Sequence, residues 1–548
     1  MASSSTAAAP VVVTEIERKF EPGPGFVLPD LSGVPGVHSV TEPREHDLDA
    51  TYFDTADLRL IAAKITLRRR TGGEDAGWHL KRPRTDGDRD ELHAPLGRAT
   101  RTVPAALRAP VEVVLRGAAL EPVVRLATTR IVRDLVDVEG AVLAEVAMDE
   151  VTATVPTQDG GVTTVSTWRE LEVELVRGDR RLLAEVSRRI EDAGAPASAS
   201  PSKLSRALGD RLPAPRPAVP RPRRKGTGAD VLLAHLAEHV GRLAANDPRV
   251  RADEPDAVHQ MRVATRRLRS ALATYRPLLD TDLTEPLRGE LQWLGEVLGY
   301  ARDAEVIRDE LRELVAGQPA DLVRGPVAAR IATSLGARYR AAHDEVLVVL
   351  SGARYFALLD GLDRLIAGPS LTAAAQQDAD DVLLPLVRRT FTRVRRLVDA
   401  VHASDPLADP EHHDELLHEV RKAAKRARYA GESLVAVHGR PAKEWAGRME
   451  AVQESLGEHQ DSVVIRTELL ALAEVAHQAG EDAFTYGRLH ALEEARAAAT
   501  EDRFERVWAS AQEKSLHSWL NGEGRAAKGG RAVKEGRAAK GGKKRGKR

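Results

Sequence analysis

The sequence predicts an α+β protein in which a strand-rich domain at residues 11–210 precedes an all-α domain at residues 229–512. In the first domain, short β-branched runs alternate with polar residues at period two, which is typical of strands. In the second, Ala, Leu, Arg and Glu recur at helical spacing. The segment RLPAPRPAVPRPRRKGTG at 211–228 separates them, and its prolines predict an extended linker.

The first domain combines many strand-like runs with a few helical stretches. Helical patterning is found near Pro104–Gly117 and Arg180–Ala193. The strand-like runs include Val11–Val13, Ile65–Leu67, Val111–Leu115 and Leu171–Val176. We therefore expect a mainly β domain with short helices between its strands.

Two motifs recur in the helical domain and predict two related halves. HQMRVATRRLRSAL begins at His259 and HEVRKAAKRARYAG at His418, while LGYARDAEVIRDEL begins at Leu298 and LGEHQDSVVIRTEL at Leu456. The two pairs have the same order and offsets of 159 and 158 residues, so an internal duplication is the simplest explanation. Helix breaks are expected near Gly317–Pro319, Gly368–Pro369, Pro406–Pro410 and Gly439–Pro441.

The charge of the chain is unevenly distributed. The net charge is −1, but the segment from Arg525 to Arg548 holds 11 of the 81 basic residues and one of the 82 acidic residues. The remainder is acidic on balance, so basic clusters within it indicate local sites for an anionic ligand. Residues 1–10 and the basic tail at 513–548 are predicted to be disordered, because they have little apolar surface to bury.

Composition narrows the possible functions. The chain has no cysteine, which excludes disulfides and thiolate metal sites. No apolar run approaches the ~20 residues of a membrane span, and the N-terminus lacks the features of a signal peptide, so we expect a cytoplasmic protein with no membrane contact. Aromatic residues make up 4%, which argues against base stacking as the main mode of ligand binding.

Acidic side chains share strand faces at both ends of the first domain. Glu15, Glu17 and Lys19 lie at i, i+2 and i+4, so in a strand they point the same way. Two carboxylates on one face repel each other unless a cation lies between them. The segment WRELEVEL repeats the pattern with Glu170, Glu172 and Glu174. Hard oxygen ligands of this kind suit Mg²⁺ or Mn²⁺ rather than zinc.

Basic side chains follow the same alternation. Arg68 and Arg70 share a face in ITLRRR, and Lys81 ends the strand-like GWHLK. A solvated sheet face would explain one such pair. The acidic and basic sets together favour a phosphate site, because arginine–phosphate and metal–phosphate contacts require both kinds of group in one place.

An ordered set of motifs in this domain resembles the CYTH family, the triphosphate tunnel metalloenzymes. The motifs are EIERK at Glu15–Lys19, YFDT at Tyr52–Thr55, LRRR, HLKRP, the TTR ending at Arg130, AMDEV around Asp149, ELEVEL, and SKLSRAL with Lys203. The resemblance implies an antiparallel eight-stranded β-tunnel barrel that binds a triphosphate or related substrate. It also implies a metal-dependent triphosphatase, a phosphoanhydride hydrolase.

The resemblance assigns roles by position. Divalent-metal ligands are expected at Glu15, Glu17, Glu170, Glu172 and Glu174, and catalytic residues at Glu15, Glu17, Lys19 and Lys81. Substrate phosphates are expected to contact Arg68, Arg70, Arg125, Arg130 and Lys203, with Arg133 and Asp149 at less defined positions. The sequence does not identify a general base, and no Gly-rich Walker loop is present.

The first repeated motif of the helical domain places basic residues on one helix face. His259, Arg262, Arg266 and Arg269 form one such stripe, and His418, Arg421, Lys425 and Arg428 form the other, with Arg267 and Arg426 beside them. Like charges on one face repel each other, and a facing polyanion turns that repulsion into attraction. A solvated cationic face is the alternative for one stripe, and hydrogen-bonded core histidines or metal ligands are alternatives for the two histidines.

These residues resemble the CHAD domain, a helical module with two related halves. The resemblance covers residues 229–512 and includes Arg302–Asp303 and SGARYFALL at 351–359, although the second half has Gln460–Asp461 in place of the Arg–Asp pair. It implies binding of inorganic polyphosphate, with association to polyphosphate granules as a further option. The CYTH-then-CHAD order recurs among related proteins.

The sequence therefore predicts polyphosphate binding by the helical domain and metal-dependent hydrolysis of a triphosphate in the tunnel. A non-catalytic polyphosphate scaffold, a nucleic-acid-binding protein and an adenylate cyclase are the alternatives. The paired carboxylates argue against a scaffold, and the shortage of aromatic residues argues against nucleic acid as the main ligand. Weak nucleic-acid contact is expected only through the basic tail.

Overall fold

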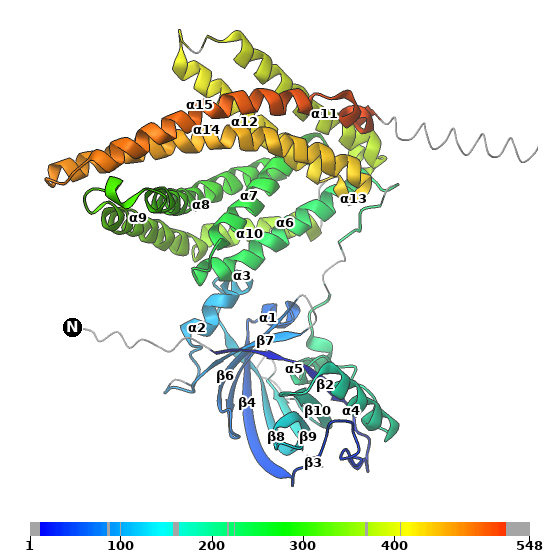
Figure 1. The fold of residues 1–548 in the computed structure, drawn as a ribbon. Coiled ribbons are helices and arrows are strands. Elements are labelled where there is room, and N and C mark those ends of the chain that lie inside the picture. Colours follow the sequence, from blue (N-terminus) through cyan, green and yellow to red (C-terminus); the bar gives the residue numbers. More distant parts are fainter. Residues whose placement is uncertain are drawn as a thin grey trace, which may run out of the picture. The chain divides into compact units, whose positions relative to one another are not determined.

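The computed structural model describes residues 11–84, 88–98, 100–156, 164–215, 219–223, 225–367, 371–405 and 407–521. The chain divides into two compact units, Met1–Arg216 and Pro217–Arg548, and the predicted α+β class is confirmed (Figure 1). Between them, residues 212–215 and 219–223 of the predicted linker form neither helix nor strand.

The first unit is built on one antiparallel sheet. Its strands are β1 (Val11–Glu15), β2 (Glu17–Phe20), β3 (Ser39–Val40), β4 (Arg44–Asp54), β5 (Thr66–Thr71), β6 (Gly77–Pro83), β7 (Arg89–Ala94), β8 (Glu121–Val136), β9 (Val142–Val155) and β10 (Thr164–Leu175). They pair in the order β1-β7-β6-β5-β4-β8-β9-β10-β2, and the short β3 adds to β8.

The two edges of this sheet meet in one stretch of chain. β1 pairs with β7 at one edge, β2 pairs with β10 at the other, and only Ile16 separates β1 from β2. The sheet therefore curls round on itself (Figure 1). We use the name tunnel for its interior, which holds a charged cavity. Counting β1 and β2 as one strand and leaving out β3 gives the eight strands that the sequence predicted.

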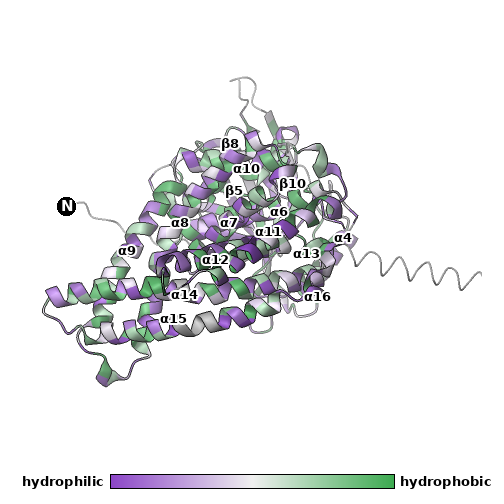
Figure 2. Ribbon diagram, turned by 90° about the horizontal axis from the view of Figure 1, so that it is seen from above, coloured by the Kyte–Doolittle hydropathy of each residue, from purple (hydrophilic) through white to green (hydrophobic). Residues whose placement is uncertain are grey.

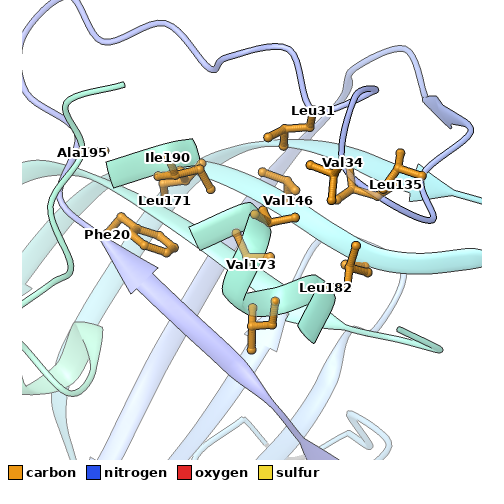
Figure 3. Close-up of a cluster of buried hydrophobic side chains, with 14 residues drawn as sticks. Phe20, Leu31, Val34, Leu135, Val146, Leu171, Val173, Leu182, Ile190 and Ala195 are labelled. Atoms are coloured by element: carbon orange, nitrogen blue, oxygen red, sulfur yellow. The ribbon is translucent and has the colours of Figure 1, made fainter. Parts of the chain in front are cut away.

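Apolar side chains lie on the outside of the curled sheet. Leu171 and Val173 of β10 alternate with the three glutamates of ELEVEL and pack against helix α4 (Arg180–Asp192), which contributes Ile190 (Figure 3). The side chain of Asp179 caps α4 by accepting bonds from the amides of Arg181 and Leu182. Because the outer face makes the core, the inner face is left to charged groups.

The run Val111–Leu115 is not a strand, which corrects one interpretation of the sequence. It lies in a 3-10 helix (Ala109–Val111) and α3 (Glu112–Leu115), which follow α2 (Ala105–Arg108). The carboxylate of Glu112 accepts hydrogen bonds from Arg108, at 2.9 Å, and from the amide of Gly117, at 2.9 Å. These local bonds hold the helical turn and override the β-branched composition. The helical pattern over Pro104–Gly117 is therefore the correct one.

Two more short helices, α1 (Arg59–Ala62) and α5 (Lys203–Leu208), complete this unit.

The second unit is all-helical in its described part. Its longer helices carry both hydrophilic and hydrophobic residues along their length, as packed amphipathic helices do (Figure 2). They are α6 (Gly228–Arg251), α7 (Ala257–Thr274), α8 (Thr281–Ala316), α9 (Val327–Leu350), α10 (Ala353–Ala367), α11 (Ala379–Ala403), α12 (Pro410–Glu432), α14 (Arg440–Gln478) and α15 (Phe484–Ala511), with the short α13 (Val435–His438) and α16 (Lys514–His517). None of the helices in the described ranges combines the length and apolar character that a membrane crossing requires.

The predicted duplication has a structural counterpart. The first motif lies on α7 and again on α12, and the second lies within α8 and again within α14. In one half α6, α7, α8 and α9 pack in sequence, and in the other α11, α12, α14 and α15 do the same. The halves meet at several contacts, among them that of α7 with α12. The faces that carry the basic stripes are therefore brought together.

The ordered chain continues beyond Gln512, where the sequence placed the end of the helical domain. Trp519 and Leu520 are buried, and the Trp519 ring lies 5.1 Å from the ring of His438 and 6.1 Å from that of Trp445. This apolar contact extends the helical unit to Asn521. The remainder of the predicted tail, 522–548, and the predicted disordered N-terminus, 1–10, lie outside the described residues.

Truncated chains can show whether the helical unit ends at Gln512 or at Asn521. Ending the chain after Gln512 removes Trp519 and is expected to destabilise the unit by about 3 kcal/mol, the lower range for loss of a buried tryptophan. Ending it after Asn521 should leave the melting temperature unchanged. Thermal unfolding of both truncated chains by circular dichroism checks this. Equal melting temperatures would show that Trp519 adds nothing to the unit.

Candidate phosphate-binding sites

The tunnel encloses a cavity of about 310 Å³ whose walls are mostly charged. Side chains from every strand of the curled sheet except β3, and from helix α5, point into it. The sequence-predicted residues that line it are Glu15, Glu17, Lys19, Arg68, Arg70, Lys81, Arg130, Glu172, Glu174 and Lys203. The odd or even position of each residue in its strand thus decides which side chains face inward.

Glu172 lies at the centre of the charged network. Its carboxylate bonds to the ammonium groups of Lys19 and Lys203, the latter at 2.6 Å, and to the guanidinium of Arg130, also at 2.6 Å. Burial alone would raise the pKa of Glu172, but these three cations hold it well below the usual range. The carboxylate is therefore ionised, and it holds three cations at the tunnel wall.

Lys203 enters the tunnel from the start of α5 and not from a strand. The side chain of Ser202 caps this helix by accepting a hydrogen bond from the amide of Ser205. Because Lys203 is the first residue of the helix, the cap fixes the direction of its side chain. The ammonium lies 2.9 Å from Asp149 and 3.0 Å from Glu170, both of which are almost fully buried. Burial would lower the pKa of Lys203, yet these carboxylates raise it, so the lysine is charged.

A second cluster lies around Lys81. Its ammonium is 2.5 Å from a carboxylate oxygen of Glu15 and 3.9 Å from one of Glu91, and Glu91 also accepts from His79 at 2.7 Å. Burial and the neighbouring Glu91 raise the pKa of Glu15 to about 8. Burial would also raise the pKa of Glu91, but hydrogen bonds with His79 and Glu15 and the charge of Lys81 lower it. Of the two carboxylates, Glu91 therefore keeps its negative charge more strongly than Glu15.

Sequence reasoning missed Glu91, although the strand pattern contains a signal for it. Glu91 of β7 stands directly opposite Lys81 of β6 in the sheet register, so it faces the same side of the sheet. Arg44, His46, Tyr52, Arg89 and Glu145 also line the cavity without having been predicted. Each lies an even number of residues from a predicted site residue or from another lining residue of its strand.

Arginines with spare donors occupy the wall formed by β5. Within the described ranges, the buried Nε atoms of Arg68 and Arg70 have no hydrogen-bond partner. Burial, together with the charges of Arg68 and Arg130, lowers the pKa of Arg70 to about 9. Arg70 pairs with Asp75, whose side chain is 59% exposed. Mutually repelling arginines with unused donors favour an anion between them.

Arg125 does not face the tunnel, which corrects its predicted role in substrate binding. It lies five residues from Arg130 on β8, so the two side chains leave opposite faces of the sheet. The Arg125 side chain is 66% exposed and pairs with Asp49 at 2.5 Å. Arg133, three residues from Arg130, also lies on the outer face, where it lines a separate surface hollow. Asp149 lies on the inner face and pairs with Arg130 at 2.8 Å.

The donor set of the tunnel fits a hard divalent cation. Glu15, Glu17, Glu172 and Glu174 line the cavity, and Glu170 is buried immediately beside Lys203. These ligands offer only carboxylate oxygens, which is the chemistry that Mg²⁺ and Mn²⁺ prefer. In this structure lysine and arginine nitrogens are the counter-ions of the carboxylates. A divalent ion would therefore take the place of ammonium groups that are already present.

In the helical unit, α7 and α12 bring the two basic stripes together in a groove. We use the name basic groove for the hollow between α7, α8 and α12 that is lined by Arg262, Arg266, Arg269, Arg288, Lys422, Lys425 and Arg426. Tyr429 and the highly exposed Tyr300 also line it. Arg288 and Lys422 were not predicted, and Arg288 comes from a helix outside both stripes.

The two stripes influence each other electrostatically. Burial lowers the pKa of Arg266, and Arg262, Arg421 and Arg269 lower it further. Burial and then the charges of Arg266, Arg421, Arg262 and Arg428 lower the pKa of Lys425 to about 7. Arg266 and Lys425 belong to different halves, so their coupling shows that both halves contribute to one concentration of positive charge.

Five of the predicted basic and histidine residues do not line the basic groove: His259, Arg267, His418, Arg421 and Arg428. Arg421 lies 3.8 Å from a carboxylate oxygen of Asp461. Arg428 pairs with Glu432 at 2.9 Å and with Glu450 at 2.5 Å, and Arg267 pairs with Glu432 at 2.5 Å. Helical spacing predicted their face but not these partners. His259 and His418 stand at the ends of the stripes, and burial followed by nearby cations lowers the pKa of each. They are therefore neutral near pH 7.

Comparison with known proteins identifies both units. Residues 14–208 match the CYTH domain and residues 234–470 match the CHAD domain. The chain is 38% identical over 491 residues to the uncharacterized protein Rv2226 of Mycobacterium tuberculosis, covering 87% of this chain and 92% of that protein. The chain therefore belongs to the family of proteins in which a CYTH domain is followed by a CHAD domain.

Three solved structures are similar to part of this chain. PptA from Streptomyces chartreusis is 25% identical, with 52% of this chain and 99% of that chain covered and a TM-score of 0.43. The CHAD domain from the plant Ricinus communis is 22% identical, with 55% and 96% covered and a TM-score of 0.42. The putative adenylyl cyclase HpAC1 from Hippeastrum, described as having a dominant triphosphatase activity, is 20% identical, with 36% and 97% covered and a TM-score of 0.23. The two matched domains and the curled antiparallel sheet fit a triphosphate-tunnel protein.

Proposed function

We propose that the tunnel hydrolyses a phosphoanhydride bond of a triphosphate or a similar phosphate chain, with Mg²⁺ or Mn²⁺ as cofactor. This proposal is supported by the tunnel cavity, which has one wall rich in carboxylates and another rich in arginines. Carboxylates crowd around Glu172 and Glu15, and arginines with unused donors lie on β5. A metal-bound phosphate chain presents the matching pair of charges.

The residues of the tunnel would share the work of positioning and neutralising the chain. Arg68, Arg70 and Arg130 would hold the phosphate oxygens, which spreads the charge that develops on the leaving phosphate. Glu15, Glu17, Glu170, Glu172 and Glu174 would hold the metal, which neutralises the chain and activates or orients water. Water adds to the terminal phosphorus, and the P–O–P bond breaks with the electron pair on the departing chain.

The two lysines nearest the carboxylates would change partners. Lys19 and Lys81 pair with Glu172 and Glu15 in this structure. With a divalent cation held by these carboxylates, both ammonium groups would be free to bind phosphate oxygens. We therefore expect metal and substrate to bind in the tunnel together. The metal would replace the lysines as counter-ion of the carboxylates, and the substrate would replace the carboxylates as counter-ion of the lysines.

Phosphate release tests this function. Tripolyphosphate, longer polyphosphate, thiamine triphosphate and nucleoside triphosphates are each incubated with the protein, with Mg²⁺, with Mn²⁺ and with a chelator. We expect release from at least one of them, dependent on metal. No release from any substrate under any metal condition would overturn the hydrolase proposal and favour a phosphate-binding scaffold.

We further propose that the helical unit binds inorganic polyphosphate along the basic groove. The observation that carries this proposal is the joint lining of one hollow by both stripes. A long chain would contact Arg262, Arg266 and Arg269 from one half and Lys425 from the other, whereas free phosphate would reach only part of the set. Affinity should therefore rise with chain length and fall steeply with salt. Calorimetric titration of the Glu172→Gln protein with chains of increasing length tests this, and an affinity independent of length would contradict it.

Binding in the groove should depend on pH through Lys425. Its pKa of about 7 means that it is half neutral at pH 7 in the free protein, and a bound polyanion raises that pKa. Binding then takes up a proton, so affinity should fall by up to about tenfold per pH unit as pH rises above 7. The charged groups that act on Lys425 are Arg262 and Arg266 on α7, Arg421 and Arg428 on α12, and Asp461 on α14.

The conservative variant isolates this effect. Lys425→Arg stays charged across the range, so its dissociation constant for long-chain polyphosphate should change little between pH 7 and 9. Titrations of both proteins at several pH values check the prediction. An equal pH slope in the two proteins would assign the dependence to another group.

A further inference from the structure

The second repeated motif of the helical unit has a use that its sequence does not reveal. It places a glycine and, four residues later, an aspartate on each of two helices: Gly299 and Asp303 on α8, and Gly457 and Asp461 on α14. Residues four apart lie on the same helix face. In both halves that face is turned toward the first motif, because α8 packs on α7 and α14 packs on α12.

Each glycine makes room for one arginine of the first motif. A Cβ atom on Gly299 would lie 3.4 Å from an Nη atom of Arg262, and a Cβ on Gly457 would lie 3.3 Å from an Nη atom of Arg421. Both guanidinium groups therefore lie directly against the backbone of the neighbouring helix. A glycine inside a helix costs about 1 kcal/mol relative to alanine, so its presence at both positions calls for a compensating role.

Each aspartate then contacts the arginine that its glycine admits. Arg262 donates from Nη1 to Asp303 at 3.0 Å, and an Nη atom of Arg421 lies 3.8 Å from a carboxylate oxygen of Asp461. The two aspartates are also near enough to act on each other, since Asp303 raises the pKa of Asp461 after burial has done so. The same arrangement thus occurs twice, once in each half.

We propose that Gly299 with Asp303, and Gly457 with Asp461, are positioning residues that form two arginine seats for polyphosphate recognition. The proposal rests on polyphosphate binding in the basic groove. Each seat holds a long side chain in one conformation before the ligand arrives, which reduces the ordering needed on binding. The carboxylates are about half exposed, so a phosphate oxygen can approach the same guanidinium from the solvent side.

Leucine at the seat glycines tests the proposal. Gly299→Leu or Gly457→Leu should displace the guanidinium and weaken binding of long-chain polyphosphate to the full-length protein by roughly tenfold. Matched controls exist on the same helices, because a Cβ at Gly289 of α8 or at Gly447 of α14 meets nothing within 4 Å. Gly289→Leu and Gly447→Leu should leave affinity unchanged. Equal weakening by seat and control variants would overturn the proposal.

A double-mutant cycle separates positioning from general damage. In an Arg262→Gln background, Gly299→Leu should have no further effect on affinity, since the side chain that it displaces is gone. An undiminished effect there would also overturn the proposal.

The same cycle is measured on thermal unfolding without ligand. Non-additive melting temperatures for Gly299→Leu and Arg262→Gln are expected if the glycine seats the arginine. If the wild-type protein binds no polyphosphate, the groove proposal fails, and this cycle still decides whether the seats exist. Strict additivity would show that they do not.

Discussion

Replacing Glu172 by glutamine is expected to slow metal-dependent phosphate release by at least on the order of 100-fold. Glu172 contacts Lys19, Lys203 and Arg130, and it is also one of the proposed metal ligands. Glutamine has nearly the same shape but no charge, so the ion loses a ligand and three cations lose their shared partner. Initial rates of phosphate release at saturating Mg²⁺ or Mn²⁺ measure the effect.

A nearby glutamate supplies the control. Glu150 on β9 has a side chain that is 71% exposed and interacts with Arg169 on the outer face of the sheet. Glu150→Gln should leave phosphate release unchanged, and both variants should keep the far-ultraviolet circular dichroism of the parent. A Glu172→Gln protein that folds and retains full activity would remove Glu172 from the proposed mechanism.

Reversing the charge of Arg266 is expected to weaken binding of long-chain polyphosphate on the order of 100-fold. Arg266 lines both parts of the basic groove and lies near Arg262, Arg421 and Lys425. Arg266→Glu therefore removes one phosphate contact and neutralises a neighbouring cation. The dependence of log affinity on log salt concentration should also become shallower, because fewer counter-ions are released.

Arg312 provides the matched comparison for this variant. It lies on α8, its side chain is 64% exposed, and it is not among the residues that line the groove. Arg312→Glu changes the net charge of the protein by the same amount, so it measures any general electrostatic effect. Similar losses for Arg266→Glu and Arg312→Glu would mean that binding is diffuse and not located in the groove.

The inward-facing residues of the tunnel were largely predictable from alternation along the strands. Glu15, Glu17 and Lys19 follow one another at intervals of two residues, and all three line the tunnel. The same rule excludes Arg125, because an odd separation from Arg130 places it on the outer face. The resemblance of the motifs to the CYTH family assigned Arg125 to substrate binding. The order of motifs along the chain does not show from which face of a strand a side chain projects.

Partners supplied by other elements could not be predicted. Glu91 joins Lys81 only through the register of β6 with β7, and Lys203 reaches Glu172 from a helix. In the helical unit, spacing along α12 gave the face of Arg428 but not its engagement by Glu450 of α14. Side-chain spacing defines a face, and packing between elements decides what that face meets.

A crossed comparison tests most directly whether one chain holds phosphate chains at two separate sites. Phosphate release from tripolyphosphate and binding of long-chain polyphosphate are measured side by side on the Glu172→Gln and Arg266→Glu proteins. Glu172→Gln should lose release and keep binding, and Arg266→Glu should lose binding and keep release. Loss of both activities through either single substitution, in a protein that still folds, would contradict two independent sites.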